Sequence, residues 1–396
     1  MTGPLHGFRI VDLTSMVSGP SATMLLADQG ADVIKVENPN GGDHTRASAN
    51  TQNGFSANFL NNNRNKRSVA LNLKDDAAKD ALLKICAGAD VFIQNFRPGV
   101  IDRMGLGEDA IRAVAPDIVY VSICGFGFDG PFMAKPVYDP LIQALSGLTT
   151  VQAGSDKERP RLVRTILPDK LTGTVAAQAI TAALLSRERT GEGQHIRLSM
   201  LDTIVAFLWG SDMGSQTFVD KPFPQQEAAS FIDLIYETAD GYISVAVMND
   251  REWAALSRAF EMPELLDDPR FRTPALRQEN IDDRLHLTQD VLLTRTSAEW
   301  LDRLEAEDVP CAPVLTRTEA IVHPQVAANG IVIETEHHLA GRLRQARPAA
   351  RFSKTPTSVR RGGPAVGEHT AEVLAEAGLS DDKITALSGG ARDAAE

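Results

Sequence analysis

Short apolar runs alternate with helix-like segments through the first third of the chain. The runs, which read as buried strands, are residues 8–13, 31–37, 67–73, 90–96 and 117–127. Between them, residues 20–30 and 74–88 have helical patterns that end on glycine, and a shorter helix is expected from about Glu108. This alternation predicts an α/β fold with a doubly wound parallel sheet. Ligands of such sheets bind beyond the carboxyl ends of the strands.

The later part of the chain has a different pattern. Residues 220–228 contain two prolines and read as a linker. Residues 231–247 predict a hairpin that turns at Asp240-Gly241, a pair that favours tight turns. Helical stretches follow to about residue 306, then a loop and a terminal helix, and residues 388–396 are expected to be frayed. The length of 396 residues suits two domains.

Charge and composition exclude several classes of function. A formal charge of −12 argues against general nucleic-acid binding. No apolar run approaches the ~18–20 residues that a membrane span needs. The N-terminus lacks a signal-peptide pattern, and the three cysteines, Cys86, Cys124 and Cys311, are odd in number and far apart. We therefore expect reduced thiols, a cytoplasmic location and no membrane partner.

Basic residues gather near the predicted strand ends. They are Arg64, Lys66, Arg67, Lys74, Arg97 and Arg103. In an acidic protein such a ridge suits a phosphorylated ligand, although solvated surface charge is the more common explanation. No G-x-G-x-x-G follows the first strand, which disfavours a dinucleotide cofactor. The histidines and cysteines lack metal-binding spacing, so no metal site is predicted.

An aspartate stands where a long helix of small residues is expected to begin, within residues 164–194. Asp169 follows Pro168, and apolar residues then recur every fourth position. One interpretation is an N-cap, since aspartate accepts hydrogen bonds from free N–H groups there. Another is a nucleophile, because the positive end of a helix keeps a carboxylate ionised. The residues alone leave both open. Cys124, at the end of a strand, is a second candidate nucleophile, but no histidine is placed by sequence to activate it, and a small buried apolar residue is the alternative.

Segments along nearly the whole chain resemble one enzyme family. They are GFRIVDLTSMVSGPSATMLLADQGADVIKVENPNGGDHTR, NRNKRSVALNLK, NFRPGVIDRMGLG, YDPLIQALSGL, RERTGEGQHIRLSMLD, DDPRFRT, VPCAPV and ARFSKTPTSVRRGGPAVGEHTAEVL. In this order they resemble the class III (CaiB/BaiF-type) coenzyme A transferases, which include formyl-CoA transferases and also have the alpha-methylacyl-CoA racemases as relatives. The resemblance implies a CoA transferase that takes an acyl-CoA and a carboxylic acid as substrates, with no permanently bound cofactor.

The resemblance also implies roles for individual residues. Asp169 matches the nucleophile that carries CoA as a thioester between donor and acceptor. The positions that match the family's CoA contacts are Val17, Ser18, Leu71, Lys74, Asn95, Phe96, Arg103 and Met104. For Phe96 and Met104, simple core packing is the alternative. Ser15, Tyr138 and Asp139 are possible neighbours of the reacting groups, and Asp139 can equally be a helix N-cap.

Two departures from the family pattern bear on the reaction. Tyr138 occupies the place of a histidine base in the racemases, and a tyrosine is a poor base at neutral pH. Transferase is therefore preferred over racemase or epimerase. Ser15 and Val17 replace the histidine and glutamine of formyl-CoA transferases, which favours an acyl group larger or less polar than oxalate. A third hypothesis, besides the transferase and the racemase or epimerase, is a protein that binds acyl-CoA without catalysis.

The fold implied by the resemblance has a large domain built from both chain ends and a small domain between them. Here the large domain would comprise residues 1–205 and 325–396, and the small domain residues 225–315. Linkers would be residues 206–224 and 316–324. Two subunits would form an interlocked homodimer.

Overall fold

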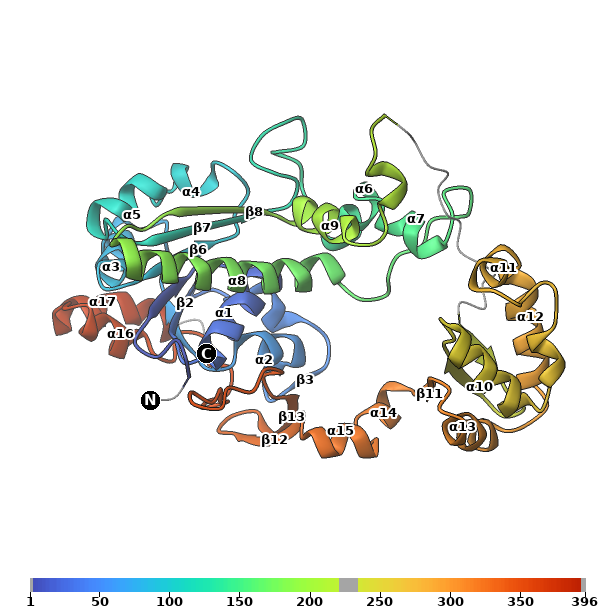
Figure 1. Ribbon diagram of the computed structural model, residues 1–396. Coiled ribbons are helices and arrows are strands. Elements are labelled where there is room, and N and C mark those ends of the chain that lie inside the picture. The colour runs from blue at the N-terminus through green and yellow to red at the C-terminus, as the bar shows by residue number, and fades with distance from the viewer. Residues whose placement is uncertain (1–2, 221–233, 393–396) are drawn as a thin grey trace. The chain divides into compact units, whose positions relative to one another are not determined.

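The computed structural model describes residues 3–220 and 234–392 in two compact units (Figure 1). One unit combines residues 1–152, 161–214 and 330–396, and the other combines residues 153–160 and 215–329. Residues 221–228 of the expected linker and 231–233 of the expected hairpin lie outside the described residues. In the described residues, no helix has both the length and the apolar character needed to cross a membrane.

A six-stranded parallel sheet forms the centre of the first unit. Its strands are β1 (Arg9–Asp12), β2 (Asp32–Glu37), β5 (Lys66–Ala70), β6 (Val91–Gln94), β7 (Val119–Cys124) and β8 (His195–Ser199). Their spatial order is β5-β2-β1-β6-β7-β8, and every neighbouring pair is parallel. The five strands predicted from apolar runs are confirmed. The edge strand β8 was not assigned from the sequence.

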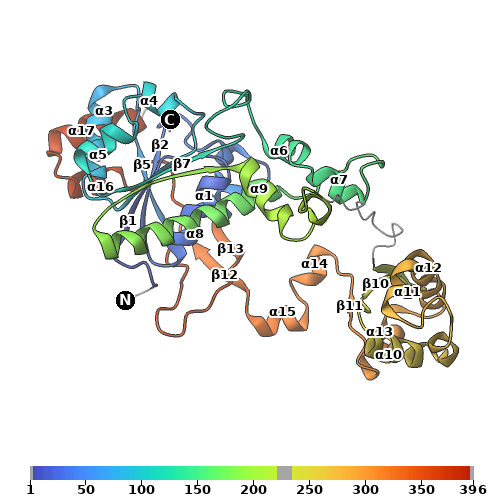
Figure 2. The ribbon, with the colours of Figure 1, turned by 45° about the horizontal axis from the view of Figure 1, so that its top comes forward.

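Helices cover both faces of this sheet, as the two views show (Figures 1 and 2). On one face lie α1 (Ser18–Asp28) and α8 (Leu167–Thr190), whose small side chains pack on the strands. On the other lie α3 (Asp76–Cys86), α4 (Val100–Arg103), α5 (Glu108–Val114) and α16 (Thr370–Glu376). The doubly wound α/β architecture is confirmed.

The strand order reverses between β1 and β6. From β1 the chain moves outward through β2 to β5, and from β6 it moves the other way through β7 to β8. The loops after β1 and β6 therefore diverge and leave a crevice at the carboxyl end of the sheet. This topological switch point is where doubly wound sheets bind ligands.

The remaining elements of this unit surround the sheet. They are η1 (His44–Ala47), β3 (Thr51–Gln52), β4 (Phe55–Ser56), α2 (Ala57–Asn63), α6 (Asp139–Leu145), α7 (Leu148–Ala153), α9 (Met200–Trp209), β12 (Val332–His337), β13 (Gly341–Ala346) and α17 (Asp381–Arg392). Residues 206–209, expected in a linker, complete α9. Residues 388–392, expected to be frayed, lie in the last part of α17, and residues 393–396 lie outside the described residues.

The second unit has its own sheet and core. Its elements are η2 (Gly214–Gln216), β9 (Ile235–Glu237), β10 (Tyr242–Val245), α10 (Asp250–Phe260), η3 (Pro263–Leu266), α11 (Pro274–Glu279), α12 (Ile281–Leu292), α13 (Ser297–Ala306), β11 (Cys311–Pro313), α14 (Arg317–Ala320) and α15 (Pro324–Asn329). The pairing of β9 with β10 confirms the hairpin around Asp240-Gly241. Trp253, Phe271 and Trp300 fill the core beneath it. Residues 317–320, also expected in a linker, form α14.

Candidate active site

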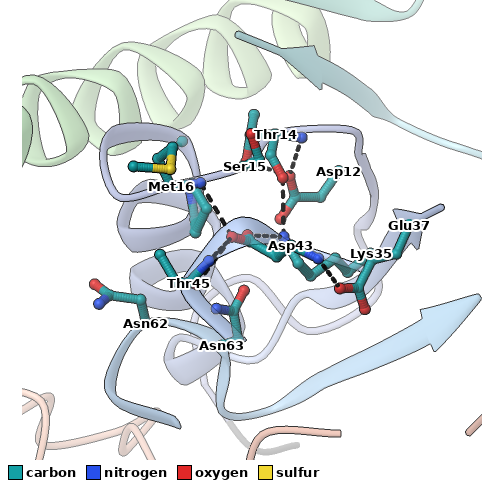
Figure 3. A network of polar contacts seen from close by, with 12 residues as sticks. Asp12, Thr14, Ser15, Met16, Lys35, Glu37, Asp43, Thr45, Asn62 and Asn63 are labelled. Atoms are coloured by element: carbon teal, nitrogen blue, oxygen red, sulfur yellow. Dashed lines mark hydrogen bonds and ion pairs between the residues drawn. The ribbon is translucent and has the colours of Figure 1, made fainter. Parts of the chain in front are cut away.

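The turn after β1 is held by buried charges (Figure 3). Asp12, at the end of β1, accepts the backbone N–H of Thr14 at 2.8 Å and the Nζ of Lys66 at 3.1 Å. The Nζ of Lys35 donates to the carbonyl oxygen of Thr14 and to Asp43, both at 2.9 Å. Because buried groups of this kind are costly to leave unpaired, the network fixes the path of the turn.

The side chains of Asp12, Lys35 and Lys66 are fully buried. Burial alone would raise the pKa of Asp12, but the ammonium groups of Lys66 and Lys35 outweigh it and lower this pKa to about 2. Burial lowers the pKa of Lys66 to about 8, whereas Lys35, facing Asp12, Asp43 and Glu37, has a raised pKa. Our sequence reading missed this network. Lys66 was expected in a basic ridge for a phosphorylated ligand, but it is fully buried and paired with Asp12, so that expectation was wrong for it.

Asn95 joins the loop after β6 to the turn after β1. Its side-chain amide donates to the carbonyl oxygen of Ser15 at 2.8 Å and accepts the N–H of Ser15 at 3.0 Å. The next residue, Met16, has a left-handed backbone with φ of 70° and donates its N–H to Asp43 at 3.2 Å. The two loops that flank the switch point are thus locked together.

Five of the predicted site residues line one cavity of about 360 Å³ beside this turn. They are Ser15, Leu71, Lys74, Phe96 and Met104. Phe96 and Met104 also pack on the sheet's core, as the packing interpretation expects, and their role as CoA contacts stays a prediction. Arg103 instead lines a neighbouring cavity of about 790 Å³, to which Phe96 contributes as well. Phe96 therefore stands between the two cavities.

Asp169 does not cap its own helix, so the N-cap interpretation was wrong. α8 begins at Leu167 with Pro168 in its first turn, and its N-cap is Ile166, whose side chain makes no capping hydrogen bond. The Asp169 carboxylate instead lies beside Ser18, whose backbone N–H and hydroxyl favour its ionised form and act to lower its pKa. Ser18 is the first residue of α1, so the carboxylate lies at the positive end of a different helix.

Asp139 provides the cap that Asp169 does not. One of its carboxylate oxygens accepts the backbone N–H of Asp169 at 3.2 Å, and the other accepts the side-chain amide of Gln143 at 2.7 Å. Asp139 is buried and is the first residue of α6, whose N-cap is Tyr138. The N-cap interpretation of Asp139 was therefore wrong, because Tyr138 is the N-cap of α6; the Asp139 carboxylate instead accepts a backbone N–H from the first turn of α8. Tyr138 itself is 68% exposed.

The pKa of Asp169 is raised to about 6, first by burial and then by the negative charge of Asp139, while the hydrogen bonds from Ser18 oppose the rise. At neutral pH roughly nine in ten carboxyl groups with such a pKa are ionised. The charge is therefore present but poorly solvated, which makes the oxygen a stronger nucleophile than an exposed carboxylate.

Asp169 lines neither cavity, but the turn after β1 connects it to the first of them. Ser15 lines the cavity and Ser18 holds the Asp169 carboxylate, with buried Val17 just before Ser18. Three residues of chain reach at most about 11 Å. Cys124 is disfavoured as the nucleophile, because it is buried and burial raises its pKa to about 11.

Comparison with known proteins gives consistent matches over the chain. The family model for CoA-transferase family III matches residues 5–370. Human succinyl-CoA:glutarate CoA-transferase is 35% identical over 96% of this chain and 87% of that protein. Formyl-CoA:oxalate CoA-transferase of Streptomyces avermitilis is 33% identical over 98% of each chain. A crystal structure of a CaiB/BaiF family protein from Brucella suis superimposes with a TM-score of 0.83 at 30% identity, covering 95% of this chain and 100% of that chain.

Proposed function

Because the chain belongs to CoA-transferase family III and is an enzyme of that class, we propose that Asp169 is the nucleophile through which it transfers CoA. The observation that carries this proposal is the environment of the Asp169 carboxylate. It is mostly ionised at neutral pH, lies beside the second carboxylate of Asp139, and interacts with Ser18 at the N-terminal end of α1.

In the proposed reaction, an Asp169 oxygen attacks the thioester carbonyl of the donor acyl-CoA. The C–S bond breaks, which gives an acyl-aspartyl anhydride and CoA thiolate. The thiolate attacks the aspartyl carbonyl, releases the donor as a carboxylate and leaves CoA on Asp169 as a thioester. The acceptor carboxylate then repeats both steps in reverse order and departs as the new acyl-CoA. Each step exchanges one acyl bond for another of similar energy, as covalent catalysis requires.

Asp139 and α1 favour this chemistry in different ways. Acylation of Asp169 removes its charge, so the repulsion by Asp139 that raises its pKa is relieved in the intermediate. The N-terminal end of α1 carries a partial positive charge that attracts the oxyanion of each tetrahedral intermediate. The repulsion by Asp139 thus destabilises the ground state, while the N-terminal end of α1 stabilises the transition state.

We propose that CoA occupies the cavity of about 360 Å³ beside the turn after β1. Phe96 and Met104 offer apolar surface to the adenine, and Lys74 offers a charge to a phosphate. For the acyl group we propose a dicarboxylic acid such as succinate. The support is the name of the human relative, together with Ser15 and Val17 at the positions of the formyl-CoA transferases' histidine and glutamine.

We further propose that the enzyme is a homodimer in the cytoplasm. Large apolar side chains are exposed on α6, α9 and the segment before α8, and contact with a second subunit would cover them. They include Leu141, Leu145, Ile166, Phe207 and Trp209. The cysteines Cys86, Cys124 and Cys311 are unpaired, as in reducing compartments. Light scattering at micromolar concentration would give twice the chain mass for the dimer.

Intact-protein mass spectrometry tests the proposed nucleophile. The wild type, Asp169→Ala and Asp169→Asn would be incubated with succinyl-CoA. We expect an adduct of CoA on the wild type, its loss with hydroxylamine, and no adduct on either variant. Adding glutarate should discharge the wild-type adduct and yield glutaryl-CoA.

The same experiment separates the alternatives. An adduct of equal yield on Asp169→Ala would exclude this residue as the nucleophile. Exchange of the α-proton of a branched acyl-CoA in deuterium oxide, without any adduct, would indicate a racemase. Tight CoA binding with neither signal would indicate a binding protein without catalysis.

A further inference from the structure

A chain of hydrogen bonds runs from helix α5 to Phe96 along the lining of the larger cavity. The Nδ1 of His195 lies 2.6 Å from Glu108, and the Nε2 lies 2.9 Å from the hydroxyl of Ser122. The side-chain amide of Gln94 donates to the same hydroxyl at 2.9 Å. The other end of that amide accepts the backbone N–H of Phe96 at 2.8 Å. These residues come from α5, β8, β7 and β6.

The direction of every bond in this chain follows from its last link. The N–H of Phe96 can only donate, so the oxygen of Gln94 faces it and the NH₂ group faces Ser122. The Ser122 oxygen therefore accepts from Gln94, and its hydrogen is left for the Nε2 of His195. The neutral ring then carries its proton on Nδ1 and donates it to the carboxylate of Glu108. Glu108 thus sets the tautomer that keeps the chain in one direction.

The far end of Glu108 is anchored as well. Its second oxygen accepts the guanidinium of Arg112 at 2.8 Å, and the ring of Tyr120 lies edge-on to His195 with 4.8 Å between centroids. Burial lowers the pKa of His195, with Arg197 and Arg112 acting in the same direction and Glu108 opposing them. The ring is therefore neutral at pH 7, as the chain of donors requires.

We propose that Glu108, His195 and Ser122 are positioning residues that hold Phe96 in place for CoA. We name these three residues and Gln94 the relay. The proposal rests on the proposed function, because Phe96 lines the cavity assigned to CoA and separates it from the larger cavity. The hydrogen bond to Gln94 fixes the backbone nitrogen of Phe96. The position of the Phe96 ring, which separates the two cavities, is thereby restricted as well. The neighbouring Asn95 is held on its other side by Ser15.

The order of serine, histidine and glutamate also occurs in hydrolases, but here the surroundings favour positioning. Ser122 is only 4% exposed and lies within β7, hydrogen-bonded on both sides. Its oxygen already accepts a hydrogen bond from Gln94, which reduces its nucleophilicity. If Ser122 were a nucleophile, as in a hydrolase, a fluorophosphonate would label it, so this labelling tests the alternative directly.

The test measures CoA binding by isothermal titration, which requires no turnover. We expect Ser122→Ala to weaken CoA binding about three- to tenfold, the effect of one lost hydrogen bond. Ser122→Thr keeps the hydroxyl and should restore the wild-type affinity. In steady-state transfer assays Ser122→Ala should raise KM for acyl-CoA and leave kcat within about twofold.

A matched pair on α5 supplies a second test at a distance from Phe96. Glu108→Ala and Asp109→Ala each remove one negative charge from the first turn of α5 and from the lining of the larger cavity. Loss of charge alone would tighten binding of the polyanionic CoA in both variants. The relay predicts weaker binding in Glu108→Ala only, because Asp109 takes no part in the relay.

Each result decides the proposal. Unchanged affinity in Ser122→Ala, or equal behaviour of the α5 pair, would overturn it, as would a fluorophosphonate adduct on Ser122. A relay variant that weakens CoA binding while wild-type Asp169 forms no thioester would uphold the relay and reject the transferase mechanism. Wild-type protein that binds no CoA would reject both.

Discussion

The raised pKa of Asp169 is a cost in folding free energy. The carboxyl group ionises less readily in the folded chain than at its model value of 3.8, since burial and Asp139 raise its pKa to about 6. Above pH 6 the unfolded state therefore gains more from ionisation than the folded state, and the charge is destabilising. Below about pH 4 the group is protonated in both states and this contribution vanishes. A catalytic group that weakens its own fold is a common trade-off.

We predict that Asp169→Asn stabilises the protein while it abolishes transfer. Asparagine keeps the size of the side chain and removes the buried charge, so the gain at pH 7 should be about 1–3 kcal/mol. Scanning calorimetry at several pH values would show a higher Tm for the variant at pH 7 and a difference that fades toward pH 4. A variant less stable than the wild type at pH 7 would show that the ionised carboxylate of Asp169 does not destabilise the folded protein.

The rate of thioester formation should depend on pH through the same group. Protonated Asp169 cannot attack, so we expect the single-turnover rate of adduct formation to fall as pH drops through about 6. Asp139→Asn removes the neighbouring charge that helps to raise the pKa of Asp169. In this variant the rate should therefore fall at a lower pH than in the wild type. Stopped-flow measurement from pH 4.5 to 8 checks both expectations. If the rate fell at the same pH in Asp139→Asn as in the wild type, burial alone would set the pKa of Asp169.

At the scale of residues, the sequence allowed us to propose the reacting residue but not its neighbours. Asp169 was singled out because it precedes a helix of small residues, yet its hydrogen-bond donor is Ser18 and its N–H is capped by Asp139. Both partners are far away along the chain, so no local pattern shows them. No local pattern shows the relay from Glu108 to Phe96 either, since its members come from four elements.

Helix α8 approaches α1 through a glycine, and this contact places Asp169. A Cβ on Gly173 would lie 2.1 Å from the hydroxyl of Ser21 and 2.8 Å from the carbonyl oxygen of Ser18. Gly173 stands one turn after Asp169, and Ser18 is the residue that holds the carboxylate. Any displacement of α8 at this point therefore moves the Asp169 carboxylate, our proposed nucleophile, relative to Ser18.

We predict that Gly173→Ala lowers both the stability of the protein and the rate of thioester formation. The added methyl group should destabilise the protein by about 1–3 kcal/mol and lower the rate of thioester formation by about tenfold or more. Chemical denaturation and the adduct assay measure the two effects. Gly88→Ala is the matched control, because a Cβ there meets no atom within 4 Å. Equal rates in the two variants would contradict the role of the close approach.

At the scale of elements, apolar runs predicted five strands, including edge strand β5, and missed the other edge strand, β8. β5 is buried along its whole length, whereas β8 has only one buried residue, Ser199, among its five. The side chains of β8 are therefore mixed, and its sequence shows no apolar run. The beginning of α8 was misplaced for another reason: Pro168 lies inside the first turn, where proline is tolerated, rather than before it.

The whole molecule is completed by the return of the chain end to the sheet. Arg67, on edge strand β5, pairs with Glu372 at 2.9 Å and with Glu376 at 2.8 Å, both from α16. Val373 and Leu374 of the same helix are buried in the core on that face. Composition and periodicity indicate a terminal helix but not its partner. A large unit assembled from both chain ends was expected only from the family resemblance.

We predict that removal of residues 370–396 abolishes cooperative folding of the sheet unit. The deletion exposes the apolar face of β5 and α3 that α16 covers, and it leaves Arg67 with Asp32 as its remaining ion-pair partner. A shorter deletion of residues 381–396 removes α17 but keeps Val373, Leu374 and both glutamates, so it should lower Tm without loss of a cooperative transition. Circular dichroism and calorimetry compare the two. If the longer deletion unfolded cooperatively at the wild-type temperature, α16 would be an accessory to the fold, and the sheet with its N-terminal helices would suffice to form the site that holds Asp169.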